Sequence, residues 1–177
     1  MSQQLSETPT GMLYFHAARS GPEAAPGEGV TMFPDIMVQG MREELTRVGF
    51  RELRTPDEVD GALQNEKRTM LVVVNSVCGC AAGKARPAIA RALQNKNRPE
   101  VLTTVFAGQD PEATAQARKY LLPYPPSSPS IALMRDGKLA FMMERRDIES
   151  SDPYTIAAVL TRAFDEFCAP AGASAKQ

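Results

Sequence analysis

The run Met70-Leu71-Val72-Val73-Val74-Asn75 constrains the fold most, because it is almost entirely apolar and contains three consecutive valines. Such a run predicts a central parallel strand that is covered on both faces. The motif Cys78-Gly79-Cys80 follows it, ahead of a helical stretch from Ala81 to Gln94. The amides and the macrodipole at the start of a helix favour the thiolate, which is the reactive form of cysteine. The segment therefore predicts thiol–disulfide chemistry at the end of a central strand.

Only Gly79 separates the two cysteines, and this spacing restricts how they can bond. Positions i and i+2 lie about 200° apart on a regular helix. A disulfide needs Cα atoms about 4.4–6.8 Å apart. We therefore expect Cys78 to lie in the loop before the helix, and Gly79 to supply backbone freedom. A ring closed so tightly should be strained and more oxidising, which makes mixed disulfides with outside thiols at least as important.

The three cysteines have different expected roles. Cys78 is the expected attacking thiol, because a sulfur just before a helix accepts amide hydrogen bonds as a cap does. Cys80 is the expected resolving thiol, with simple packing as the alternative. Cys168 stands at helical spacing from Phe164, which favours partial burial as a small hydrophobic residue over a redox role.

Hydrophobic periodicity and capping signals predict the remaining elements. Apolar residues repeat from Ile36 to Val48 at helical spacing, in the set Ile36, Met37, Met41, Leu45 and Val48, and Gly49 ends that helix. The other predicted elements are a short strand at 50–53, a helix at 55–65, a strand at 101–107, a helix at 110–121, a hairpin of strands at 130–134 and 139–143, and a helix that begins at 152–153. The order is a leading helix followed by βαβαβαββα. It predicts an α/β, thioredoxin-like fold, with a central mixed sheet flanked by helices and an extra N-terminal helix.

A chain of 177 residues is long enough for one domain with a proper core, and its length argues against two. Residues 1–30 are rich in Gly, Pro, Ala and Glu, and we expect them to form a flexible N-terminal extension. We assign residues 31–170 to the thioredoxin-like domain and residues 171–177 to a flexible C-terminal tail.

Composition excludes several classes of function. The formal net charge is −1 with both signs interspersed, so nothing indicates a nucleic-acid or anionic-membrane partner. Three cysteines cannot form the even-numbered framework of a small secreted protein, and the amino terminus lacks the features of a signal peptide or membrane anchor. We therefore expect a cytoplasmic protein. The only histidine is His16, so a Cys/His zinc site would need distant partners, and we expect no metal and no bound cofactor.

The segment from Val72 to Ala88 resembles the signature of the bacilliredoxins, also described as thiol–disulfide isomerases with a Cys-Gly-Cys site. Similarity extends to segments 41–46, 53–59, 125–133 and 136–138. The resemblance implies a thioredoxin-like fold. It also implies an enzyme that removes bacillithiol, a low-molecular-weight thiol, from mixed disulfides on client proteins. Arg146 departs from the family pattern, because a histidine is expected there.

The same resemblance implies a cis proline opposite the active cysteine, at the start of the strand that opens the hairpin. Pro129 occupies that place. A cis Ser128–Pro129 bond would leave neighbouring backbone groups free to pair with the main chain of a client. Gly79, Ser128 and Pro129 are therefore the expected substrate-binding residues. The expected partners are S-thiolated client proteins and the small thiol itself, which acts as a co-substrate.

Two alternative functions stay open. A protein disulfide isomerase or weak oxidant would use the same dithiol, whereas a non-catalytic redox sensor or metal-binding module would show no turnover.

Lys84 and Arg86, within two turns of the dithiol, could attract an anionic thiol, although a solvated helix face explains them at least as well. Pro87 is expected to kink the helix at the carbonyl of Gly83.

Overall fold

The structure, a computed structural model, describes residues 33–170. The expected extension at 1–30 and the expected tail at 171–177 lie outside the described residues, so the domain boundaries stay predictions. Within the described part of the chain, no helix is long and apolar enough to cross a membrane.

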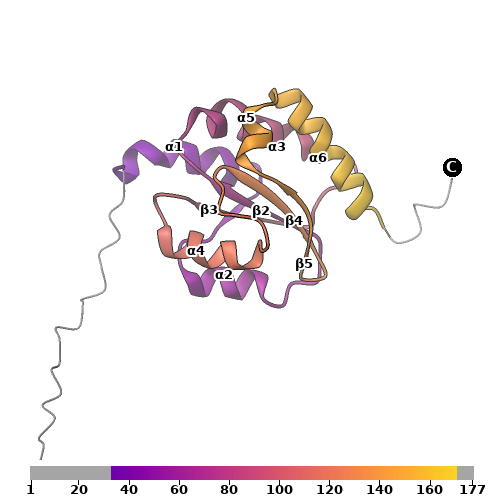
Figure 1. The fold of residues 1–177 in the computed structure, drawn as a ribbon, viewed down its shortest axis with the longest axis horizontal. Helices are drawn as coiled ribbons and strands as arrows, with labels where there is room; N and C mark the ends of the chain where they lie inside the picture. The colour runs from indigo at the N-terminus through magenta and orange to yellow at the C-terminus, as the bar shows by residue number, and fades with distance from the viewer. Residues whose placement is uncertain (1–32, 171–177) are drawn as a thin grey trace, which may run out of the picture.

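A five-stranded mixed sheet forms the centre of the fold (Figure 1), with the strand order β1-β3-β2-β4-β5. Its strands are β1 (Arg51–Glu52), β2 (Met70–Asn75), β3 (Val101–Phe106), β4 (Ser130–Arg135) and β5 (Lys138–Met143). β2 is parallel to β3 and antiparallel to β4, and all of its residues are buried. The predicted bounds and central position of β2 are confirmed, as are the mixed sheet and the order of the strands along the chain.

Helices cover both faces of the sheet. They are α1 (Asp35–Thr46), α2 (Pro56–Leu63), the π-helix η1 (Ala81–Ala85), α3 (Arg86–Ala92), α4 (Pro111–Tyr120), α5 (Arg145–Glu149) and α6 (Pro153–Phe167). Figure 1 shows α2 and α4 below the sheet and α1, α3, α5 and α6 above it. Leu71 and Val73 pack with α3 and α6, whereas Val72 and Val74 pack with α2 and α4. Because alternate side chains of β2 enter two different cores, almost every position in this strand is apolar.

Local capping chemistry determines where several elements begin, as the sequence predicts. Thr55 forms a capping box with Glu58 at the start of α2. The carboxylate of Asp152 accepts hydrogen bonds from two backbone N–H groups in the first turn of α6. The turn between β4 and β5 places Asp136 and Gly137 at φ values of 52° and 72°. Positive φ at both central residues is what a two-residue type I′ hairpin requires.

The helix α1 buries only part of the face that its apolar repeat predicts, since Leu45 is buried as expected but the first turn is not. Ile36 and Met37 are exposed, with relative accessibilities of 80% and 61%. The buried residues of the helix are Val38, Arg42 and Leu45. The prediction was wrong for Ile36 and Met37, and it missed Arg42 because hydrophobicity predicts that an arginine faces solvent.

Arg42 is stable inside the protein because two carboxylates bind its guanidinium. Its Nη1 lies 2.8 Å from Oε1 of Glu52 and 2.7 Å from Oδ2 of Asp110. Its guanidinium also lies over the ring of Phe106. Burial by itself would raise the pKa of Glu52, but hydrogen bonds from Arg42 and Arg54 outweigh it and hold that pKa below its ordinary value. The cluster ties α1 to β1 and to the start of α4.

The predicted helix from Ala81 to Gln94 forms in two parts. The first part, η1, is a π-helix, in which the N–H of Arg86 donates to the carbonyl of Ala81. The second part, α3, has Pro87 in its first turn. Pro87 has no N–H to donate to the carbonyl of Gly83, so the disturbance expected from the proline takes the form of a wider helical turn.

We expect Arg42→Ala to lower the free energy of unfolding by about 3–5 kcal/mol at neutral pH, because it leaves the partly buried carboxylate of Asp110 without its ion pair and leaves Glu52 with only the exposed Arg54. Arg47→Ala is the matched control on the same helix, since its exposed pair with Glu43 should contribute about 1 kcal/mol or less. Urea unfolding measures both losses. Equal losses for the two variants would contradict the role of the buried cluster.

The same cluster predicts how stability depends on pH. Because the folded-state pKa of Glu52 is depressed, its contribution is present above the ordinary value of 4.5 and is lost as the pH falls through the lower folded-state value. The difference in unfolding free energy between the wild type and Arg42→Ala should therefore shrink as the medium is acidified. A difference that stays constant on acidification would show that Glu52 does not depend on Arg42.

Candidate functional site

The dithiol lies in the segment between β2 and η1, which we call the dithiol turn (residues 76–80). Cys78 and Cys80 form a disulfide with Cα atoms 5.4 Å apart, within the range that a bridge requires. The carbonyl of Cys78 accepts hydrogen bonds from the N–H groups of Ala81 and Ala82, at 3.0 and 3.2 Å. Cys78 therefore stands just before the helix, and its predicted position is confirmed.

Gly79 does not supply the special backbone freedom that the sequence argument requires of it. Its φ lies outside the left-handed region, and a Cβ at this position would meet no atom within 4 Å. The bridge closes because Cys78 precedes the helix, whereas Cys80 lies inside its first turn. Cys78 and Cys80 are half-buried and Gly79 is exposed. Cys80 also packs against the core beside α3 and α6, so it both contributes to the packing and forms the bond to Cys78.

A polar network that the sequence analysis does not predict lies behind the dithiol turn. The hydroxyl of Ser76 donates to Sγ of Cys78 at 3.2 Å. The N–H of Ser76 donates to Oδ1 of Asn75 at 2.9 Å, and its carbonyl accepts from Nη1 of Arg86 at 3.2 Å. Arg86 is only 3% exposed and also donates to both carboxylate oxygens of Glu44. The expectations of a solvated or anion-attracting Arg86 were therefore wrong. The one sequence signal for the network is the polar pair Asn75-Ser76 behind an apolar run.

The loop before β4 lies beside the end of β2. The Ser128–Pro129 bond is cis, as the resemblance implies. Val74 pairs with Ser130 in the antiparallel register, which sets Pro129 opposite the last residue of β2. The structure thus brings Pro129 to the strand end that leads into the dithiol turn. Substrate binding by Gly79, Ser128 and Pro129 stays a prediction.

The short helix α5, which the sequence does not predict, contacts η1 next to the dithiol turn. It contains one apolar residue, so hydrophobic periodicity cannot reveal it. The backbone N–H of Arg145 donates to Oγ of Ser127, and its guanidinium donates to the carbonyl of Ser128 and to Oε1 of Glu149. Lys84 of η1 donates to the carbonyl of Glu149. α5 therefore joins the loop before β4 to the helix that follows the dithiol.

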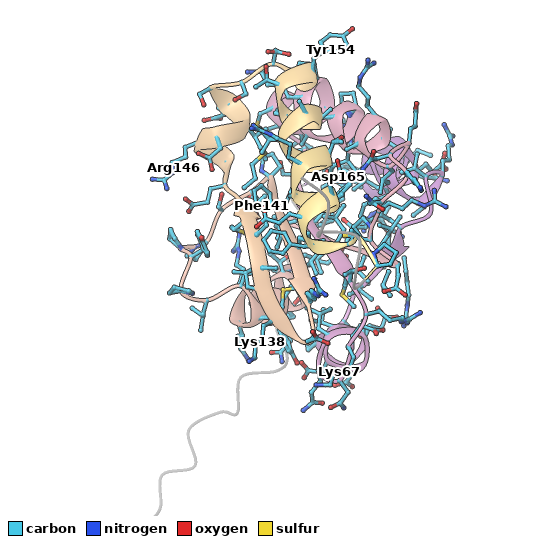
Figure 2. All side chains as sticks on the ribbon, turned by 90° about the vertical axis from the view of Figure 1, so that its right-hand side faces the viewer. Lys67, Lys138, Phe141, Arg146, Tyr154 and Asp165 are labelled. Carbon is cyan, nitrogen blue, oxygen red and sulfur yellow. A yellow bond between two sulfur atoms is a disulfide. The ribbon has the colours of Figure 1, made fainter. Side chains whose placement is uncertain are left out.

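Arg146 points outward from α5 into solvent (Figure 2), and its side chain is 80% exposed. It lies 2.7 Å from the carboxylate of Glu144 and 3.8 Å from that of Asp147. A guanidinium does not lose its proton in proteins. The position where the family pattern leads us to expect a histidine therefore carries no acid–base group in this chain.

Cys168, which is free and half-buried, lies at the opposite end of the sheet from the dithiol. It shares a surface pocket with Thr69, the residue before β2, whereas the dithiol follows β2. A six-residue strand such as β2 spans about 20 Å. Burial raises the pKa of the Cys168 thiol. The expected partial burial is confirmed, and Cys168 is too distant to resolve Cys78 within one chain.

Within residues 33–170, no three His, Cys, Asp or Glu side chains gather as metal ligands. His16 lies outside the described residues.

Comparison with known proteins adds independent observations. The family described as Disulphide isomerase matches residues 33–168. A bacilliredoxin of Koribacter versatilis (strain Ellin345) is 56% identical over 143 residues, which cover 80% of this chain and 99% of the relative. A bacilliredoxin of Geobacillus kaustophilus (strain HTA426) is 53% identical over 137 residues, which cover 77% of this chain and 93% of the relative. A solved structure with a thioredoxin fold superposes with a TM-score of 0.52 at 16% identity, over 67% of this chain and 96% of that chain.

The strand order, the superposition, the strand-end dithiol and the relatives together define a thiol–disulfide oxidoreductase of thioredoxin-like fold. The superposition supports the assignment of the fold, and the relatives support the assignment of the activity. Within this class, the chain belongs to the bacilliredoxin family.

We expect Gly79→Ala to keep the fold and the disulfide, and to stabilise the first helical turn by up to about 1 kcal/mol. A Cβ at this position meets open space, and alanine can adopt the backbone conformation. Thermal unfolding and thiol titration of the oxidised variant measure the two effects. Gly49→Ala is the contrasting variant, because a φ of 103° strains any L side chain and should destabilise the protein. Loss of the disulfide in Gly79→Ala would show that the glycine is required.

Proposed function

We propose that this protein removes bacillithiol from mixed disulfides on client proteins through attack by Cys78. The observation that carries the proposal is the position of Cys78, which is half-buried just before a helix and whose backbone carbonyl accepts the first backbone hydrogen bonds of that helix. At such a helix start, the macrodipole favours the thiolate. The relatives are named bacilliredoxins, which supports bacillithiol as the small thiol.

In the first step, the Cys78 thiolate attacks the sulfur that bacillithiol contributes to the mixed disulfide. The bond between that sulfur and the client cysteine breaks, and a Cys78–bacillithiol disulfide forms. The client cysteine leaves as a thiolate with the bonding electron pair and takes a proton from water. One disulfide replaces another, so no external oxidant or reductant is needed at this stage.

In the second step, the Cys80 thiolate attacks the sulfur of Cys78 and releases bacillithiol as a thiolate. The product is the Cys78–Cys80 disulfide, the bridge that the structure contains. Opening this bridge again takes two electrons, which an external dithiol or two low-molecular-weight thiols supply. A second small thiol can also resolve the Cys78 adduct directly, in which case Cys80 is not needed.

Gly79, Ser128 and Pro129 are the proposed contacts with the client. Gly79 is the exposed residue between the two cysteines, and the loop that carries the other two lies beside the end of β2. The carbonyl of Ser128 accepts only a long hydrogen bond, 3.4 Å, from the exposed Arg145, so a client N–H can replace that donor. In this scheme the small thiol is a co-substrate, no bound cofactor takes part, and the proposed place of action is the cytoplasm.

A disulfide isomerase or weak oxidant is the second candidate, and the family description Disulphide isomerase favours it. The same Cys78 thiolate would then attack a disulfide between two protein cysteines. A redox sensor or metal-binding module without turnover is the third candidate. Repeated turnover of a client with a mixed disulfide separates the first candidate from the third.

We expect Cys78→Ala to abolish transfer, and Cys80→Ala to keep the first step and accumulate a mixed disulfide on Cys78. Mass spectrometry of the enzyme after reaction with a bacillithiol-modified client detects the adduct, and a glutathione-modified client tests the choice of thiol. Cys168→Ala is the control, because its sulfur lies at the far end of the sheet. An adduct trapped on Cys80 would reverse the two roles. Equal transfer from both clients would overturn the specificity for bacillithiol.

A further inference from the structure

We infer that Ser76 is a catalytic residue whose hydroxyl stabilises the Cys78 thiolate, and that Arg86 is a positioning residue that holds Ser76 in place. The inference rests on the proposed function, because it matters for catalysis only if Cys78 is the attacking sulfur. It adds a side-chain donor to the backbone amides and the helix macrodipole, which are the features that the motif itself suggests.

The contact between Ser76 and Cys78 has the geometry of a hydrogen bond to sulfur. Oγ of Ser76 lies 3.2 Å from Sγ of Cys78, and Ser76 is only 7% exposed. A donor that bonds to the charged form of a group lowers its pKa, and the effect is stronger where water is excluded. When the bridge is reduced, the same hydroxyl is placed to donate to the free thiolate.

The backbone of Ser76 is held on both sides, which fixes the point from which its hydroxyl reaches the sulfur of Cys78. Its N–H donates to Oδ1 of Asn75 at 2.9 Å, and its carbonyl accepts from Nη1 of Arg86 at 3.2 Å. The same Nη1 lies 3.1 Å from Oδ1 of Asn75. Arg86 therefore binds the two residues that connect β2 to the dithiol turn.

Arg86 is in turn held by the N-terminal helix α1. Its Nε donates to Oε2 of Glu44 at 2.8 Å, and Nδ2 of Asn75 donates to the carbonyl of Met41 at 3.3 Å. Arg86 is 3% exposed, so its charge would be unpaired inside the protein without Glu44. The helix that precedes the thioredoxin-like core thus supplies the outer end of the network that positions Ser76.

The other charged groups near the dithiol turn are bound elsewhere. Lys84 of η1 donates to the carbonyl of Glu149, and Arg145 of α5 pairs with the carboxylate of the same residue. Arg146 pairs with Glu144 and Asp147. Within residues 33–170, Ser76 is the side chain that donates a hydrogen bond to the sulfur of Cys78. The side-chain contribution to thiolate stability is therefore assigned to Ser76.

The first test measures the pKa of Cys78 in the full-length protein with Cys80→Ala and Cys168→Ala, which leaves one thiol. The rate of alkylation by iodoacetamide is followed against pH. Ser76→Ala should raise the pKa of Cys78 by about one unit, which is a tenfold smaller acid dissociation constant. Ser76→Thr should restore the lower value because it keeps the hydroxyl, and Ser150→Ala, an exposed serine elsewhere, should leave it unchanged. An unchanged pKa in Ser76→Ala would overturn the role of Ser76.

The second test separates positioning from a direct effect of charge. Glu44→Ala and Glu43→Ala each remove one negative charge from α1, but only Glu44 binds Arg86. Through charge alone, either variant would lower the pKa of Cys78. If Arg86 positions Ser76, Glu44→Ala should instead raise the pKa when Ser76 is present, and should not raise it in the Ser76→Ala background. If Glu44→Ala lowered the pKa of Cys78 in both backgrounds, or raised it equally in both, the positioning role of Arg86 would be overturned.

Arg86→Lys provides a further check because it keeps the charge but cannot bind Ser76, Asn75 and Glu44 together as the planar guanidinium does. It should raise the pKa of Cys78, and an unchanged value in a folded variant would contradict the positioning role. Alkylation needs neither a client nor bacillithiol. The Ser76 assignment and the proposed function can therefore fail separately: a Ser76-dependent pKa without transfer from a bacillithiol-modified client would overturn the proposed function alone.

Discussion

Burial of β2 on both of its faces is the constraint on which the rest of the structure depends. Its side chains enter two separate cores, one with α3 and α6 and one with α2 and α4, so packing holds the strand in place from both sides. The chain therefore leaves the sheet at one defined point, behind Asn75. Everything chemical in the site is built at that point, because the dithiol turn, the start of η1 and the loop before β4 all meet at this end of the strand.

Two buried arginines join the N-terminal helix to the rest of the domain, one from each side. Arg42 of α1 binds carboxylates of β1 and of the start of α4, whereas Arg86 of α3 binds the end of β2 and Glu44 of α1. Buried ion pairs are weak evidence for stability, since removing charges from water is costly. Their directional hydrogen bonds nevertheless fix the positions of the joined elements relative to one another. We interpret α1 as a support for the dithiol turn, which explains why a helix outside the βαβαβαββα pattern belongs to the same domain.

The distribution of thiols follows from the same architecture. Cys78 and Cys80 lie at one end of β2, and Cys168 lies at the other, where burial raises its thiol pKa. A strand length of about 20 Å keeps the third thiol out of the exchange between the other two. The chain therefore has one dithiol centre, and any third sulfur in the reaction comes from outside. The proposed exchange between a client, a small thiol and the protein dithiol needs no further sulfur from the chain.

The sequence by itself determined the features that depend on neighbours within a few residues: the bounds of β2, the position of Cys78 before the helix, the caps of α2 and α6, and the tight hairpin turn. Only the tertiary structure decided which face of α1 is buried, the presence of α5, and the network behind Ser76. Glu44 and Arg86 are 42 residues apart, and Arg42 and Asp110 are 68 apart. A local sequence pattern predicts that an arginine is exposed to solvent. Its burial becomes favourable only when folding brings distant carboxylates and carbonyls to its guanidinium, and a local pattern does not contain that information.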